Sequence, residues 1–367
     1  PRRAGRSRRQ RDGHLRARNA TCNRTVAVER PHVARRPGRR SHRHRHGRPL
    51  DTWSIVNGPA NLPPRATHTG PDEVLRRLDL AVAHKLDGLL HGEYQGLVPG
   101  HGSELGETRG YSPGDDVRRI DWNVTARMQA PHVRDTIADR ELETWALVDL
   151  GPSMDFGTAY CEKRDMAVSA AAAVGFLTNR TGNRFGVVLA RPDGSEVVPA
   201  RGGRQHLMAS LHRLVVSPRL DSGTVDLGAA MQRLGAVARR RGLVTVVSDL
   251  LTDPDQWTQP LRRLAARHET IVVEVIDPRE LSLPDVGVLR VVDPATGRTR
   301  DVPTASKKLR QRYEGAAAEQ RQRTAAAVRS AGADHLVLRT DRDWLLDVLR
   351  FVVSRRERVH ARRAGWG

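Results

Sequence analysis

The sequence predicts an α/β protein with a Rossmann-like, doubly wound sheet that is mostly parallel. After residue 142, short apolar runs alternate with helical segments, as expected when helices join parallel strands and cover both faces of the sheet. The first run, TWALVDL, is apolar at almost every position, which is typical of a strand buried on both faces. The alanine-rich segment at 163–178 is suited to a helix packed closely on such a sheet.

The composition divides the chain into four parts. Residues 1–70 form an Arg-rich tail and linker, and residues 71–142 form a helix plus a loop-rich subdomain with small strands. Residues 143–357 hold the α/β domain, and residues 358–367 a basic C-terminal tail. We expect the first part to be disordered, because it has almost no apolar periodicity and a strong charge bias.

The basic charge is concentrated at the start of the chain. Residues 1–50 hold 17 Arg, no Lys, one Asp and one Glu, and the rest of the chain has 45 basic and 40 acidic groups. The formal net charge of +20 therefore does not indicate that the body binds nucleic acid. The excess of Arg over Lys and a first Met at position 128 favour an extension from a wrongly placed start in a GC-rich genome. The alternative is a basic arm that binds nucleic acid.

Several function classes lack support in the sequence. No apolar run approaches the roughly 20 residues of a spanning helix, and no signal peptide is evident. Cys22 and Cys161 are far apart and have no partner at zinc-binding spacing. We expect a soluble, cytoplasmic protein.

The elements can be assigned in order along the chain. From Pro71, Leu and Val recur at helical spacing and predict a helix of about five turns. Pieces such as HVRDTI predict small strands. The strands of the α/β domain are predicted at TWALVDL, RFGVVLA, SEVVPA, LVTVVSDL, ETIVVEVID and DHLVLRT, with an exposed hairpin at VLRVVDPATGRTRDVP. Its helices are predicted at 163–178, GRQHLMASLHRLV, TVDLGAAMQRLGAVARR with Thr224 as its cap, DQWTQPLRRLAAR, 304–331 and DRDWLLDVLRFVVSRR.

Oxygen-bearing side chains follow two of the predicted strands. Asp149 ends the first strand and is followed by Ser153, while Asp249 ends a later strand and Thr224 precedes a helix. In a doubly wound sheet, ligands bind at the carboxyl ends of the strands, where the strand order reverses. Carboxylates and hydroxyls are ligands that Mg²⁺ prefers. The four residues predict a Mg²⁺ site, and the alternative is that the two acids cap the following helices.

Two stretches resemble known families. The pattern of these four residues resembles the metal-ion-dependent adhesion site of the von Willebrand factor A fold. ELGETRGYSPGDDVRRIDWNVTAR, from Glu104 to Arg127, resembles the signature of the bacterial domain-of-unknown-function 58 family, and the resemblance covers about residues 75–360. We call residues 104–127 the signature loop, and its matching residues are Arg109, Tyr111, Pro113, Gly114, Asp115, Asp116, Arg118, Asp121, Trp122 and Arg127.

The resemblance implies a von Willebrand factor A-like domain with Asp149, Ser153, Thr224 and Asp249 as ligands of Mg²⁺ or another divalent cation. Gly151 replaces one serine of the Asp-x-Ser-x-Ser pattern, which weakens the predicted site, although a water could take the place of the missing hydroxyl.

The signature loop is dense in charges of both signs. It could be a surface for docking a partner. The favoured interpretation is a salt-bridge network that holds the subdomain on the sheet, with Ile120 and Trp122 as buried anchors. Trp145 and Trp344 are expected in the core.

The resemblance implies a non-enzymatic adaptor or co-chaperone that links a MoxR-type AAA+ ATPase to a client protein during assembly or metal loading. The alternative is a Mg²⁺-dependent phosphohydrolase or nuclease that uses Asp149 and Asp249. Against it, the three candidate loops contain no His, and the chain has no phosphate-cradling glycine loop and no Gly-x-Ser-x-Gly motif.

Overall fold

The computed structural model describes residues 27–28, 70–90, 108–111, 120–134, 142–179 and 183–364. Most of the predicted tail and linker lies outside the described residues, so its disorder stays a prediction. Within it, the two-residue strand β1 (Ala27–Val28) pairs antiparallel with β9 (Val288–Val292), which the expectation of a structureless tail did not include.

The predicted central sheet is confirmed, and it has six strands in the order β11-β8-β7-β4-β5-β6. Each pair of neighbours is parallel except β5 and β6, which form the predicted hairpin. This is the doubly wound order that the resemblance to the von Willebrand factor A fold implied. The strands are β4 (Glu143–Asp149), β5 (Arg184–Arg191), β6 (Gly194–Gly202), β7 (Leu243–Ser248), β8 (Glu269–Ile276) and β11 (Asp334–Arg339).

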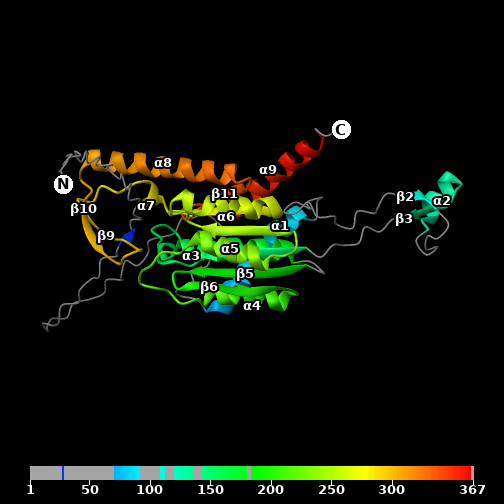
Figure 1. Cartoon of the computed structure of the whole chain (residues 1–367), viewed down its shortest axis with the longest axis horizontal. Coiled ribbons are helices and arrows are strands. Elements are labelled where there is room, and N and C mark those ends of the chain that lie inside the picture. The colour runs from blue at the N-terminus through cyan, green and yellow to red at the C-terminus, as the bar shows by residue number, and fades with distance from the viewer. Residues whose placement is uncertain are drawn as a thin grey trace, which may run out of the picture.

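Helices cover both faces of this sheet (Figure 1). Each face has its own hydrophobic cluster, as a sheet buried on both sides requires. One cluster is formed with α1 (Pro71–Leu90), α3 (Lys163–Thr178), α4 (Arg204–Val215) and α9 (Trp344–Ala364). The other is formed with α5 (Leu227–Val237), α6 (Pro254–Arg267) and α8 (Lys307–Ser330). Trp344 lies in the first cluster and Trp145 in the second, so their predicted core positions are confirmed.

Helix α3 packs closely on the sheet because its contacting side chains are small. Ala170 to Ala173 are each at most 2% exposed. A Cβ added at Gly175 would lie 2.5 Å from the side chain of Leu207 on α4, so α4 also approaches α3 closely. The alanine-rich sequence of α3 therefore allows the close packing on the sheet that was expected from it.

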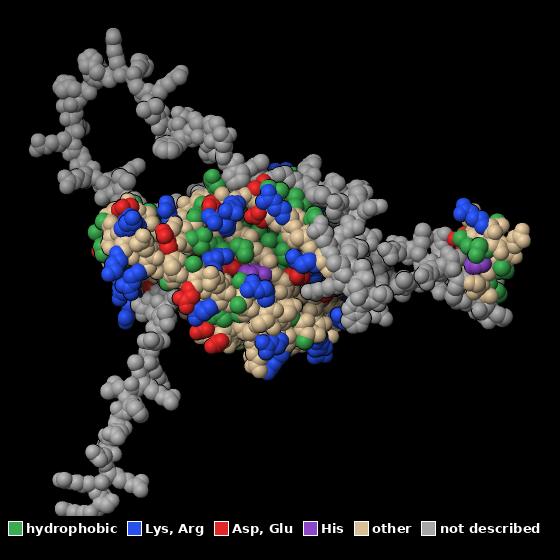
Figure 2. Space-filling model, turned by 90° about the horizontal axis from the view of Figure 1, so that it is seen from above, with side chains coloured by type: hydrophobic (Ala, Val, Ile, Leu, Met, Phe, Trp, Pro, Cys, Tyr) green, Lys and Arg blue, Asp and Glu red, His purple; other side chains and the backbone are tan. Residues whose placement is uncertain are grey.

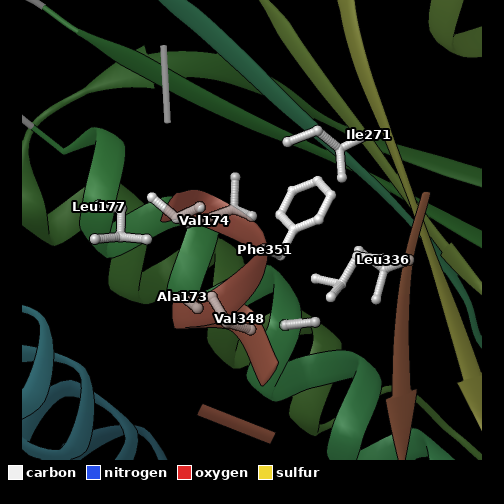
Figure 3. A pocket seen from close by; sticks show the side chains of 10 residues that line it. Ala173, Val174, Leu177, Ile271, Leu336, Val348 and Phe351 are labelled. Atoms are coloured by element: carbon white, nitrogen blue, oxygen red, sulfur yellow. The ribbon is translucent and has the colours of Figure 1, made fainter. Parts of the chain in front are cut away.

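Beneath α9 the core has a small apolar pocket. Phe351 and Val348 of α9 face Ile271 and Leu336 of the sheet across it (Figure 3). Its volume is about 20 Å³, which is close to that of a single water position, and an apolar space of this kind stays dry. We treat it as a packing defect of the core.

Two smaller β structures accompany the main sheet. Strands β9 and β10 (Thr299–Pro303) form the predicted exposed hairpin. Strands β2 (Thr108–Gly110) and β3 (His132–Arg134) pair with each other and contact α2 (Trp122–Met128). We call β2, α2 and β3 the signature unit, and Figure 1 shows it apart from the main sheet. The remaining elements are η2 (Pro152–Asp155), a 3-10 helix, and the short helix α7 (Pro278–Leu281).

Among the helices of the described residues, none combines the length and the hydrophobicity needed to cross a bilayer.

Candidate functional site

The candidate site lies where β4, β7 and β8 end, an edge that we call the carboxyl edge. Strands β4 and β7 are neighbours at the point where the strand order reverses, which is where doubly wound sheets bind ligands. Asp149 is the last residue of β4, and Asp249 follows the last residue of β7. The structure thus brings the two predicted carboxylates to the same edge, and both are buried.

The carboxylate of Asp149 is held by its own loop and by β7. Its Oδ1 accepts a hydrogen bond of 2.9 Å from the backbone N–H of Gly151. Its Oδ2 accepts one of 2.7 Å from the hydroxyl of Ser248. The same Ser248 oxygen accepts a bond of 3.1 Å from the N–H of Leu250. Asp149 therefore joins the ends of two neighbouring strands.

Asp249 has a partner that the sequence analysis did not predict. The ammonium group of Lys163, at the first turn of α3, donates to Asp249 Oδ2 over 2.8 Å. It also forms an ion pair with Oε1 of Glu280, in α7. Lys163 is completely buried, and Glu280 is 9% exposed. The site is a buried acid–ammonium–acid arrangement that connects the ends of β7 and β8 through the start of α3.

Local sequence places Lys163 at this position. Glu162 and Asp165 form a capping box, which fixes the start of α3 just before Lys163. The backbone N–H of Lys163 donates to the carbonyl of Phe156 over 2.8 Å, and its ammonium lies 5.9 Å from the centre of the Phe156 ring, a cation–π distance. Burial by itself would lower the pKa of Lys163, but the charges of Asp249 and Glu280 outweigh it and raise this pKa. The side chain is a cation at neutral pH.

Two acids of the site bind protons more readily than free carboxyl groups. Burial raises the pKa of Asp149 to about 6, and the negative charge of Asp249 contributes to the increase. Burial also raises the pKa of Glu280 to about 6, although the charge of Lys163 opposes the increase. Asp149 and Glu280 therefore lose negative charge as the pH falls through about 6.

A third strand end is fixed by Asp277, which follows β8 and is fully buried. Asp277 Oδ2 accepts hydrogen bonds from the backbone N–H of Thr158 over 2.7 Å and from the hydroxyl of Thr340 over 2.8 Å. Asp277 also forms a capping box with Glu280 at the start of α7. Through these bonds the loop before α3 and the end of β11 are held beside Glu280.

The hydroxyl-bearing residues of the predicted metal site are less buried than its two carboxylates. Ser153 is half-buried in η2, and Thr224 is exposed. Thr224 is also not the cap of α5, which begins after Asp226 as N-cap, whose side chain accepts from the N–H of Ala229. The expected cap was wrong because a carboxylate two residues later takes the capping position.

Gly151 is crowded, and this explains the absence of a serine there. Its backbone is extended, with φ −67° and ψ 164°, so no unusual conformation requires glycine. A Cβ at this position would lie 3.0 Å from Val225 Cγ2 and 3.2 Å from Asp149 Oδ1. Val225, beside Thr224, is buried. A side chain at Gly151 would therefore crowd Val225 and Asp149, which would have to shift by a few tenths of an ångström to admit it.

The residues of this site do not fit Mg²⁺ well. An ammonium group already bonds one oxygen of Asp249, and Gly151 supplies no hydroxyl and would crowd Val225 if it carried a side chain. In the part of the chain that the structure describes, no three His, Cys, Asp or Glu side chains are grouped so that they could hold a metal ion.

The helix-capping alternative is also not what the structure has. The residue that caps η2 is Gly151, and α6 is capped by Asp253. Asp149 and Asp249 each accept a hydrogen bond from a backbone N–H two residues later. They stabilise tight turns after the strands and do not cap the helices.

Only part of the signature loop is described. Pro113, Gly114, Asp115, Asp116 and Arg118 lie outside the described residues. Arg109 lies in β2, and Arg127 is an exposed residue in the last turn of α2.

Hydrogen bonds shape the described part of this loop. The backbone N–H of Tyr111 donates to the carbonyl of Pro131 over 2.8 Å. Asp121 caps α2 by accepting from the N–H groups of Asn123 and Val124.

The expectation that Trp122 anchors this loop in the core is wrong. Trp122 is 71% exposed, and Met128 of the same helix is 63% exposed. Helix α2 has no buried residue. It is a seven-residue helix in a unit apart from the main sheet (Figure 1), where Val133 of β3 is buried but no residue of the helix is. Ile120 is half-buried.

Sequence reasoning missed Lys163, Glu280 and Asp277. One signal was available for the lysine, because the chain has only four Lys among 62 basic residues. A lysine where the chain otherwise uses arginine, at the start of a helix that faces the carboxyl edge, indicates a position that needs a compact cation. A signal for Glu280 was also available, because Asp277 and Glu280 in the Asp-Pro-Arg-Glu stretch have capping-box spacing, which indicates the turn that positions Glu280.

Comparisons with known proteins identify relatives. A mycobacterial protein, "Uncharacterized protein Rv1480" of Mycobacterium tuberculosis strain H37Rv, is 52% identical over 283 residues, which are 77% of this chain and 89% of the relative. "Uncharacterized protein MAV169" of Mycobacterium avium is 44% identical over 160 residues, 43% of this chain and 94% of the relative.

Two solved structures are similar at low identity. The protein BatB from Bacteroides thetaiotaomicron has a TM-score of 0.38 at 12% identity, over 59% of this chain and 99% of the other. The SpRpn10 VWA domain has a TM-score of 0.35 at 13% identity, over 57% and 94%. The fold assignment rests on the strand order above and not on these two likenesses.

The family is shown by a match over more than half of the chain. The family model described as "Protein of unknown function DUF58" matches residues 107–323, which include the described part of the signature unit and most of the doubly wound sheet. This match and the mycobacterial relative agree with the signature found in the sequence. The chain belongs to the DUF58 family.

Proposed function

We propose that this chain is a protein-interaction adaptor that works with a MoxR-type AAA+ ATPase and links it to a client protein during assembly or metal loading. The observation that carries the proposal is the exposure of Trp122 and Met128 on α2. A contiguous patch of apolar side chains that remains in water marks a surface that binds other proteins. Tryptophan is also among the residues that contribute most to such contacts.

The position of these residues supports docking. Figure 2 shows hydrophobic side chains at the surface of the signature unit, which projects from the body of the molecule. Neither Trp122 nor Met128 contributes to the two hydrophobic clusters of the main sheet. Their exposure therefore does not serve the packing of the domain. We assign the signature unit as the element that contacts the ATPase.

The carboxyl edge supports a non-enzymatic role. Lys163 is fully buried and bonded to two carboxylates, so it does not offer a free amine as a nucleophile. The neighbouring Arg164 is bonded to Asp155 and to the carbonyl of Leu150. The charged groups at this edge are used in holding loops together.

The test is retention of the purified chain by an immobilised MoxR-type ATPase. Trp122→Ala combined with Met128→Ser should reduce retention at least about tenfold, because an anchor of this size contributes 2 kcal/mol or more. The matched control is Leu80→Ala, another exposed apolar side chain, at 48% exposure, on α1 of the body. The control should bind like the wild type. Equal retention of the double variant would contradict the assignment of the signature unit.

The enzyme alternative has its own test. Purified protein is assayed for phosphatase and nuclease turnover with Mg²⁺ present, alongside Asp249→Ala. We expect no turnover in either protein. Turnover that is present in the wild type and lost in Asp249→Ala would overturn the adaptor proposal in favour of a metal-assisted hydrolase.

A further inference from the structure

We propose that the ammonium group of Lys163 replaces the divalent cation at the carboxyl edge, so that this site is permanently occupied by a charge of the chain itself. The inference deepens the proposed function, on which its consequence for partner binding rests. The replacement itself concerns only residues within this chain.

The ammonium of Lys163 lies between the ends of two strands. It bonds Asp249, which follows β7, and Glu280, which lies in the turn after β8. These strands are neighbours in the sheet. Asp249 is one of the residues predicted to hold the metal, and the ammonium donates to its Oδ2 over 2.8 Å. A divalent cation bound to that oxygen would have to share it with the ammonium, whose positive charge repels it.

The buried charge of Lys163 is compensated by neighbouring carboxylates. Lys163 has no exposed surface, and a buried cation is tolerated only when anions and hydrogen-bond acceptors compensate for the lost hydration. The compensating groups are Asp249 and Glu280, and the negative charge of Asp149 lies close enough to contribute. The carboxylates that would attract a metal ion are therefore the groups that stabilise the lysine.

The predicted set of metal ligands is also incomplete. A small divalent cation needs a nearly complete shell of oxygen ligands, whereas an ammonium needs only acceptors for its three N–H groups. Gly151 supplies no hydroxyl, and a side chain there would crowd Val225 and Asp149. A metal at this edge would take more of its shell from water, whereas the ammonium needs no ligand from Gly151.

The consequence concerns how the site is regulated. If the charge comes from Lys163, loops at the carboxyl edge keep their arrangement without Mg²⁺ and are not released by chelators. Partner binding by this domain should then be constitutive with respect to divalent cations.

The experiment uses Mn²⁺ as a probe on the full chain. Bound Mn²⁺ is measured by electron paramagnetic resonance, and the unfolding midpoint is measured in EDTA and in millimolar Mg²⁺ or Mn²⁺. The wild type should show no saturable binding at this edge and the same midpoint in all three conditions. Lys163→Met, which keeps the apolar stem, should have a lower midpoint in EDTA that Mn²⁺ raises. It should bind Mn²⁺ at least about tenfold more tightly than the wild type, because a unit charge beside two carboxylates is removed.

Two control variants test whether the gain in Mn²⁺ binding arises at the carboxyl edge. Lys308→Met removes an exposed lysine and should behave as the wild type. Adding Asp249→Ala to Lys163→Met should abolish the new binding. If the wild type binds Mn²⁺ and Asp249→Ala binds it equally well, the ion is bound elsewhere on the chain. That result agrees with the proposal.

Two results would overturn it. One is wild-type Mn²⁺ binding that Asp149→Ala or Asp249→Ala abolishes, and the other is a folded Lys163→Met without a gain in affinity. If Lys163→Met does not fold, the wild-type titration decides. No partner is present in these measurements, so failure of the ATPase contact leaves their outcome intact.

Discussion

At the scale of single residues, Gly151 is the position where the chain departs from the adhesion-site pattern. Val225 Cγ2 lies 3.0 Å from where a Cβ would be. Gly151→Ser would restore the hydroxyl of the adhesion-site pattern, but it should destabilise the fold by about 1–3 kcal/mol, because extra atoms in a packed space force neighbours to move. The free energy of unfolding in urea measures this effect.

A double-mutant cycle with Val225→Ala tests the cause. The cost of Gly151→Ser should be smaller when Val225 is already truncated, because the two side chains compete for one space. A cost that is the same in both backgrounds would show that crowding by Val225 is not the reason for the glycine.

Asp149 gives the site a dependence on pH. Its pKa is about 6 in the fold, mainly through burial, and 3.8 without it, so the folded chain binds a proton in this window that the unfolded chain has released. This contribution to stability is fully present below about pH 4 and is lost as the pH rises through about 6. Asp149→Asn should therefore gain stability relative to the wild type between pH 5 and 8, by roughly 1–2 kcal/mol.

The free energy of unfolding by denaturant is measured for both proteins across this pH range, and the wild-type value is subtracted from that of Asp149→Asn. The difference cancels other groups such as His268, whose pKa is lowered by burial and which destabilises the fold as the pH falls. A difference that does not change with pH would contradict the raised pKa of Asp149.

At the scale of elements, α9 closes one face of the sheet. Phe351 is 8% exposed and lines the apolar pocket with Ile271 and Leu336 (Figure 3). Phe351→Ala should lower the free energy of unfolding by about 3 kcal/mol, because it enlarges an existing cavity in a core that cannot collapse fully. Leu346→Ala, on the same helix but 42% exposed, should change it by less than about 1 kcal/mol. Equal effects of the two changes would mean that α9 does not pack as described.

The apolar side chains of helix α2 are less buried than its composition suggests. A tryptophan in a predicted loop-rich subdomain is ordinarily a core anchor. Here the helix has seven residues and none of them is buried. Sequence alone did not reveal this, because burial depends on whether a second apolar surface comes near.

At the scale of the whole molecule, the N-terminal tail is strongly basic, whereas the rest of the chain is nearly balanced in charge. We predict that deletion of residues 1–60 abolishes any salt-sensitive retention on DNA, since 17 of the chain's Arg lie in residues 1–50. The deletion removes β1 from its pairing with β9 but takes none of the described residues of the two hydrophobic clusters, so the unfolding midpoint should change little. Retention that survives the deletion would place DNA binding on the body.

The sequence by itself determined the doubly wound sheet, the helices on both faces and the edge where Asp149 and Asp249 meet. These features follow from periodicity and from the direction of parallel strands, which are local properties of the chain. Only the tertiary structure decided what fills that edge. Lys163 is 86 residues from Asp249 and 117 from Glu280, and no local pattern shows that its ammonium lies between them. Burial, pairing and crowding are properties of residues that meet only in the folded chain, and they place a lysine between two acids at the edge where the sequence predicts a metal site.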